Sequence, residues 1–167
     1  MLSAAGVLAI LDRLNAAGMR CWLDGGWGVD ALLGVQTRPH DDLDLVVAAG
    51  DMPALCAALA QDGFALIEDA LPTRAVLRAP PDRRLDLHPV TFDVEGGGTQ
   101  LLPGGASFRY PPDGFHGQGV IAGHAVTCLS AEVQVLCHTG YEPDADDRRD
   151  VQALCARFGL ALPMGYG

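Results

Sequence analysis

The segment Asp42-Leu43-Asp44, which leads into an apolar run over residues 45–47, constrains the fold of this chain more than any other stretch. It predicts a β-strand over residues 42–48. Side chains two residues apart on a strand point to the same face, so the carboxylates of Asp42 and Asp44 are expected side by side. Like charges at that separation stay ionised only if a positive group lies between them. A hard divalent cation with oxygen ligands meets this requirement.

Two other features belong with this strand. Leu85-Asp86-Leu87-His88 has the character of a second strand, and we expect Asp86 to supply a third carboxylate. Gly25-Gly26 precedes a helix predicted to begin at Trp27, and such a turn lets backbone amides approach an anion. The combination predicts metal-dependent nucleotidyl transfer, with two Mg²⁺ ions bridged by the first two carboxylates. Asp86 is then a ligand of the second ion and the base that accepts the proton of the attacking hydroxyl.

The basic residues narrow the choice of phosphate ligands. All eleven are arginine, which excludes a P-loop lysine and a lysine nucleophile. We therefore expect Arg38 to contact the triphosphate, with Arg148 or Arg149 as the second choice. The formal net charge of −10 argues against a nucleic-acid partner and suits a cationic small molecule, although solubility alone would also explain it.

Length and cysteine content indicate an ordinary globular domain. A chain of 167 residues is most simply one domain with a real core. The five cysteines are scattered and odd in number, which favours isolated thiols over disulfides or a zinc site. No stretch approaches the length of a membrane span, and the N-terminus lacks the basic start of a secretory signal, so we expect a cytoplasmic protein.

Apolar periodicity and turn residues predict the other elements. Helices are expected over residues 2–17, 27–33, 51–61, 130–138 and 144–158, and strands over 20–23, 42–48, 64–68, 74–78 and 84–91. Residues 93–118, rich in Gly and Pro, are expected to form a long loop before a hairpin over 119–128. The order predicts an α/β (α+β) domain with a mixed sheet, flanking helices and a helical C-terminal extension. Residues 1–92 would be the core and residues 93–167 the acceptor side of one compact unit.

These motifs resemble a known family. The stretch from Asp24 to Gly34, followed by Gln36-Thr37-Arg38-Pro39-His40 and Asp42-Leu43-Asp44, is similar to the lincosamide nucleotidyltransferases of the small single-domain type. The aminoglycoside 2″-nucleotidyltransferases share the Gly-Gly-Trp and Asp-x-Asp parts. Further matches reach His138-Thr139-Gly140-Tyr141 and Asp150-Val151-Gln152, so the resemblance extends over most of the chain. Departures lie mainly in residues 67–82 and 93–107.

The resemblance implies a polymerase-β-type nucleotidyltransferase fold, two Mg²⁺ ions, and transfer of a nucleoside monophosphate from a nucleoside triphosphate to a hydroxyl. In the lincosamide enzymes the acceptor is an antibiotic, and its inactivation gives resistance. Asp42, Asp44 and Asp86 match the metal-binding carboxylates of the family, and Gly25-Gly26 matches its phosphate turn. The family also implies a homodimer with a shared cleft.

The remaining site residues are expected on either side of the cleft. We expect Trp27 to contact the nucleotide, and the alternative is that it is a core or pocket-wall residue. The acceptor is assigned Tyr110, Phe115, His138 and Tyr141. For His138, as for His88, a hydrogen-bonded structural role is the alternative.

Other functions stay open at this point. A nucleotidyltransferase of the same fold with an aminoglycoside, a metabolite or a protein hydroxyl (antitoxin-like) as acceptor is one. A non-catalytic nucleotide-binding module is another, although the three carboxylates argue against it. A metal-dependent phosphohydrolase is weaker, because such enzymes usually use several His ligands, and on the predicted strands only His88 accompanies one of the candidate metal-binding carboxylates.

Overall fold

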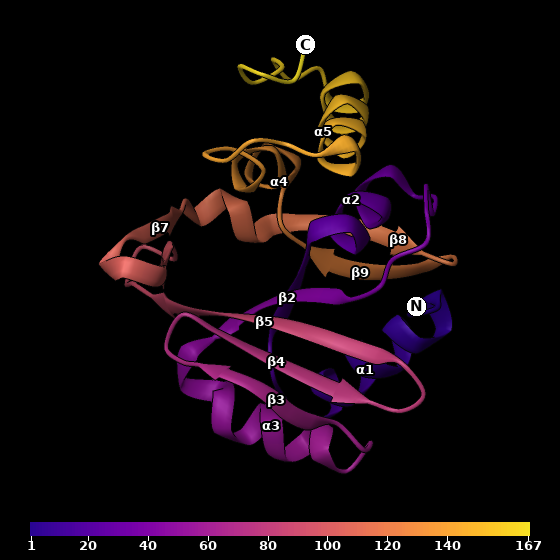
Figure 1. Cartoon of the computed structure of the whole chain (residues 1–167), viewed down its shortest axis with the longest axis vertical. Coiled ribbons are helices and arrows are strands. Elements are labelled where there is room, and N and C mark those ends of the chain that lie inside the picture. The colour runs from indigo at the N-terminus through magenta and orange to yellow at the C-terminus, as the bar shows by residue number, and fades with distance from the viewer.

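The computed structural model describes all 167 residues and is built around one mixed β-sheet (Figure 1). Its strands are β1 (Cys21–Asp24), β2 (Leu43–Ala48), β3 (Ala65–Ala70), β4 (Arg74–Ala79), β5 (Arg83–Phe92), β6 (Gly98–Leu101), β7 (Ser107–Tyr110), β8 (Gly117–Ile121) and β9 (His124–Cys128). The main path runs β3-β4-β5-β2-β1-β9-β8, and β6 and β7 continue from the far end of β5. The mixed sheet predicted from the sequence is confirmed.

Five α-helices accompany the sheet: α1 (Ala4–Ala16), α2 (Gly25–Leu33), α3 (Met52–Ala60), α4 (Ala131–Cys137) and α5 (Ala145–Phe158). Their ends follow local sequence. Ser130 caps α4, and Asp144 forms a capping box with Asp147 at the start of α5. Gly34 and Gly159 end α2 and α5 in the left-handed conformation that glycine adopts without strain. None of the five α-helices combines the length with the apolar composition that a membrane-spanning helix needs.

The alternation of side chains along β2 separates a structural face from a functional one. Leu43, Leu45 and Val47 are fully buried in the main core, which also takes in residues of α1 and α3. Asp44 and Val46 therefore point to the opposite face. Val46 packs there in a second apolar cluster with Trp22, Val90, Tyr110, Phe115, Leu129 and Val133.

The C-terminal helices are attached to the sheet through α2. Val29 of α2 packs with Ala131 and Val135 of α4 and with Val151 and Leu154 of α5 in a third apolar cluster. Figure 1 shows α4 and α5 near α2, at the opposite end of the molecule from α3. Since β9 pairs with β1 in parallel, the sheet continues past residue 92. The division of the chain at residue 92 stays a prediction.

The long loop expected over residues 93–118 is wrong. These residues contain β6, β7, a short helical turn over Pro112–His116 and the start of β8. Their hydrogen-bonded partners are distant in sequence: β6 pairs with β5 and with β7. A Cβ at Gly98 would lie 2.3 Å from Val90 Cγ1, so glycine there permits close packing on β5 rather than marking a loop.

Candidate active site

Three carboxylates lie abreast on neighbouring strands of the functional face. Asp24, the last residue of β1, is paired with Asp44 of β2 in the antiparallel register. Asp44 is paired with Asp86 of β5 in the parallel register. Paired residues on adjacent strands point to the same face, with Cβ atoms about 5 Å apart. The sheet thus brings together three acids whose mutual repulsion requires a positive partner.

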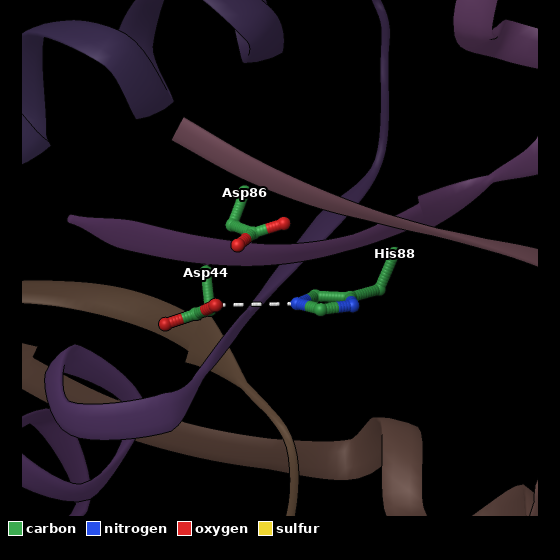
Figure 2. A group of neighbouring side chains, drawn as sticks. All are labelled: Asp44, Asp86 and His88. Atoms are coloured by element: carbon green, nitrogen blue, oxygen red, sulfur yellow. Dashed lines mark hydrogen bonds and ion pairs between the residues drawn. The ribbon is translucent and has the colours of Figure 1, made fainter. Parts of the chain in front are cut away.

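His88, two residues after Asp86 on β5, forms a cluster with Asp44 and Asp86 (Figure 2). One ligand atom from each of Asp44, Asp86 and His88 lies within 4.8 Å of the others. His88 Nε2 lies 3.2 Å from Asp44 Oδ1. Burial lowers the pKa of His88, but the carboxylates of Asp44, Asp24 and Asp86 outweigh burial and raise it to about 8. Two carboxylates and one imidazole so close together fit a divalent cation.

Asp42 lies just before β2 and lines the same cleft as Asp44. Burial and the neighbouring charge of Asp44 raise the pKa of Asp42. Burial also raises the pKa of Asp24, against the opposing charge of His88. Burial is the larger cause of both pKa shifts, and the charge of Asp44 adds to it in each case.

Asp86 has a direct partner of the opposite charge. Arg74 of β4 donates from Nε to Asp86 Oδ1 at 2.6 Å and from Nη2 to Asp86 Oδ2. Arg84 Nη2 lies 3.8 Å from the same carboxylate. Asp86 is only 5% exposed, so Arg74 is the group that compensates its buried charge here.

The Gly25-Gly26 pair forms the first turn of α2 rather than a turn before it. Asp24 caps this helix by accepting a hydrogen bond from the Gly25 amide at 2.8 Å. A Cβ at residue 25 would lie 2.5 Å from Asp44 Oδ2, and one at residue 26 would lie 2.4 Å from His40 Nδ1. The two glycines therefore allow the helix N-terminus, which attracts anions, to meet the carboxylates directly.

The predicted nucleotide ligands are placed differently from one another. Arg38 lines the cleft, and its Nη2 donates to Asp150 of α5 at 2.9 Å. Arg149 lies on α5 and bonds Asp146 at 2.7 Å, and it is not among the residues that line the cleft. Trp27 is 2% exposed and packs against His40 at 4.9 Å between ring centres, beneath the cleft.

The predicted acceptor ligands separate in the same way. His138 and Tyr141 line the cleft. Tyr110 and Phe115 do not reach it, because both are buried in the second apolar cluster. The Tyr110 hydroxyl instead donates to Gln100 Oε1 at 2.8 Å. Gln100 Nε2 lies 3.3 Å from His88 Nδ1, so Tyr110 supports the site from behind.

The whole cleft has a volume of about 340 Å³. It is lined by Asp24, Gly25, Gly26, Arg38, His40, Asp42, Asp44, His88, Cys137, His138, Tyr141 and Asp147. Asp86 adjoins this set through its pairing with Asp44. Most of the residues predicted from the sequence to contact phosphate, metal or acceptor therefore line or adjoin one cleft, and Trp27, Tyr110, Phe115 and Arg149 do not.

Sequence reasoning did not assign several of these residues. Asp24 directly precedes the glycine pair, which was its only signal. His40 is held by the buried Asp30, which also accepts hydrogen bonds from the amide and hydroxyl of Thr37. Asp147 accepts a hydrogen bond from Tyr141 at 3.2 Å. Only the folded chain shows that these acids contact cleft residues.

Curated proteins of two kinds are similar to this chain. A lincosamide resistance protein of Staphylococcus haemolyticus is 32% identical over 145 residues, which are 87% of this chain and 89% of that protein. A 2″-aminoglycoside nucleotidyltransferase of Escherichia coli is 32% identical over 126 residues, which are 75% of this chain and 65% of that protein.

Solved structures give the same pattern. The lincomycin-bound lincosamide antibiotic adenylyltransferase LnuA superposes with a TM-score of 0.82 at 31% identity, over 92% of this chain and 96% of that one. ANT(2″)-Ia in complex with adenylyl-2″-tobramycin has the same fold, with a TM-score of 0.77 at 24% identity, over 93% of this chain and 89% of that one. The predicted nucleotidyltransferase fold is confirmed.

A sequence model of one family covers almost the entire chain. The family is described as aminoglycoside-2″-adenylyltransferase, and the match spans residues 6–154. That span contains the three abreast carboxylates, the glycine pair and Arg38. The protein therefore belongs to the aminoglycoside-2″-adenylyltransferase family of antibiotic nucleotidyltransferases.

Proposed function

We propose that this protein inactivates a lincosamide antibiotic by transferring the adenylyl group of ATP to one of its hydroxyls, with Mg²⁺ as cofactor. The alignment of Asp24, Asp44 and Asp86 at the N-terminus of α2 is the observation that carries the proposal. It joins a site of high negative charge to an anion-binding helix end, which a metal–triphosphate complex requires.

The residues present fit the metal. Asp42, Asp44 and Asp86 offer carboxylate oxygens, and of the three only Asp86 forms an ion pair with arginine. When bound, two Mg²⁺ ions supply charge neutralisation at the α-phosphate and favour ionisation of the attacking hydroxyl. His88 lies on the Asp44 side of this group and fixes the orientation of that carboxylate.

Residues of this chain bind the triphosphate and take up the proton of the acceptor hydroxyl. The Gly26 amide in the first turn of α2 would donate a hydrogen bond to an oxygen of the outer phosphates, whereas the Gly25 amide donates to Asp24. Arg38 adds a guanidinium on the same side of the cleft. Asp86 takes the proton of the acceptor hydroxyl. This requires Arg74 to give up its hydrogen bond to one of the two carboxylate oxygens of Asp86.

The acceptor would occupy the end of the cleft formed by the C-terminal segment. His138, Tyr141 and Asp147 line that end. The carboxylate of Asp147 suits a protonated amine, and the ring of Tyr141 offers an apolar surface with a polar tip. We further propose that a second copy of the chain closes the open side of the cleft, to be tested by light scattering of the purified protein.

The test is incubation of the purified protein with ATP, Mg²⁺ and lincomycin, followed by mass spectrometry and measurement of pyrophosphate release. The expected result is a product heavier by one adenylyl group, and its loss when EDTA is added. Parallel reactions with the other nucleoside triphosphates identify the preferred base. Absence of any product with all acceptors and with either Mg²⁺ or Mn²⁺ would contradict the proposal.

An aminoglycoside is the second candidate acceptor. The net charge of −10 and the acidic acceptor end of the cleft suit a polycation. The extent of the matches favours a lincosamide acceptor, since the match covers 89% of the lincosamide resistance protein but only 65% of the aminoglycoside nucleotidyltransferase. Tobramycin is therefore included beside lincomycin, and adenylation of tobramycin alone would reverse the order of the two.

A further inference from the structure

We propose that Asp150 is a positioning residue for ATP, because it holds the guanidinium of Arg38 at the phosphate end of the cleft. This inference rests on the proposed function. Asp150 does not line the cleft itself and would act only through Arg38.

The geometry around one nitrogen carries the argument. Arg38 Nη2 donates to Asp150 Oδ2 at 2.9 Å. A Cβ at Gly26 would lie 2.9 Å from the same Nη2, which places this nitrogen beside the first turn of α2. Arg38 Nη1 is also 3.6 Å from Asp146 Oδ2. The guanidinium is therefore held from the α5 side while its edge faces the glycine pair.

Burial makes Asp150 the dominant partner. Asp150 is 2% exposed, whereas the side chain of Asp146 is 48% exposed. A buried carboxylate has no water to replace its partner, so removing either member of the Arg38–Asp150 pair costs far more than breaking an exposed pair. Arg38 Nε is buried without a hydrogen-bond partner, so the Nη atoms make the contacts that fix the side chain.

The pair also connects distant parts of the chain. Arg38 and Asp150 are 112 residues apart in sequence. Val151, the next residue on α5, packs against Val29 of α2 in the third apolar cluster. The docking of α5 on α2 thus sets where Arg38 points, and an arginine left free would sample many rotamers.

Two roles for Asp150 predict opposite effects on ATP. If Asp150 positions Arg38, its loss weakens ATP binding because the guanidinium is no longer held near the phosphates. If Asp150 merely neutralises Arg38, its loss frees a positive charge and strengthens ATP binding. The sign of the change therefore separates the two roles.

The experiment is calorimetric titration of Mg²⁺–ATP without acceptor into wild type, Asp150→Asn, Arg38→Gln and the double variant. We expect each single variant to bind ATP about tenfold more weakly or worse, which is the scale expected for a disrupted buried charge pair. The double variant should bind no more weakly than Arg38→Gln, because both changes remove the same contact. Asp12→Asn, an exposed acid of α1, controls for the loss of one negative charge.

The inference would be overturned if a folded Asp150→Asn bound ATP as tightly as wild type or more tightly. It would also be overturned if the losses of ATP affinity in the two single variants added up in the double variant, or if the wild type did not bind Mg²⁺–ATP. If Asp150→Asn fails to fold, Arg38→Lys replaces it. Lysine keeps the positive charge but lacks the planar guanidinium that can bond Asp150 and a phosphate together, so an unchanged ATP affinity of Arg38→Lys would again overturn the inference. ATP binding without adenylation of any acceptor would instead count against the proposed function alone.

Discussion

The backbone of Gly25 and the carboxylate of Asp44 are in such close contact that a Cβ at residue 25 would lie 2.5 Å from Asp44 Oδ2. Gly25 also has φ +57°, where L-residues with a side chain are strained. Residue 25 therefore serves the site twice, by turning the chain into α2 and by leaving space for the carboxylate.

We expect Gly25→Ala to reduce the rate of adenylyl transfer by roughly a hundredfold or more. The new methyl group would displace the Asp44 carboxylate, and a displacement of about 1 Å in a precisely oriented site lowers the rate by roughly this factor. Gly18→Ala is the matched control, since Gly18 has φ +74° with no atom near its Cβ position. Both variants should lose stability through backbone strain, about 1–2 kcal/mol. Initial rates and thermal unfolding of the two proteins separate strain from the effect on the site. Equal rates for the two variants would refute this account.

Asp44→Asn should leave the fold intact and reduce kcat by roughly a hundredfold or more, because it removes several kcal/mol of charge stabilisation at the metal. The neighbouring Asp41 is exposed and does not line the cleft. Asp41→Asn should therefore stay close to wild type. Rates of pyrophosphate release measured over a range of Mg²⁺ concentrations provide the test. Near wild-type turnover by a folded Asp44→Asn would eliminate the metal site as described.

Asp86→Asn should lower kcat far more than it raises KM for ATP, because a base acts on the transition state rather than on nucleotide binding. The substitution also removes the charged partner of Arg74, so its folding must be checked by circular dichroism. Steady-state kinetics with ATP and acceptor varied in turn give the two constants. A large rise in KM with unchanged kcat would leave Asp86 a binding residue only.

The ion pair between Arg13 of α1 and Asp62 after α3 should make stability depend on pH in the acid range. Arg13 donates from Nε and Nη2 to the two carboxylate oxygens, each at 2.7 Å, and these hydrogen bonds lower the pKa of Asp62. A carboxyl with a lower pKa in the folded state stabilises the fold above its unfolded pKa of about 3.9. That stabilisation is lost as the pH falls through the folded pKa.

The free-energy difference of unfolding between wild type and Asp62→Asn should therefore shrink as the pH is lowered from 7 to 3. Urea titrations of both proteins at several pH values measure it. Arg13→Gln should reproduce the same loss, and combining the two changes should add little. A difference that stays constant over this pH range would show that the pair does not contribute through its charge.

Local sequence was sufficient for much of the fold and for part of the site. The strand carrying Asp44, the strand around Asp86 and the helix at the glycine pair are properties of short segments, and the structure contains all three. Asp42 lies just before β2 and shares a cleft with Asp44, and the helix already begins at Gly25 rather than at Trp27. The region of residues 93–118 was not predictable in this way. Its strands depend on pairing with β5, and its glycines and prolines are typical of loops when read alone.

Sequence by itself thus determined the strand carrying Asp44 and the presence of a helix through residues 27–33, because side-chain period and turn chemistry are local properties. Tertiary structure alone decided that Asp24 lies beside Asp44, that Arg74 neutralises Asp86 and that Asp150 holds Arg38. It also buried Tyr110 and Phe115 away from the cleft. These outcomes depend on which strands become neighbours and where α5 docks, and such long-range contacts form only when the whole core is assembled.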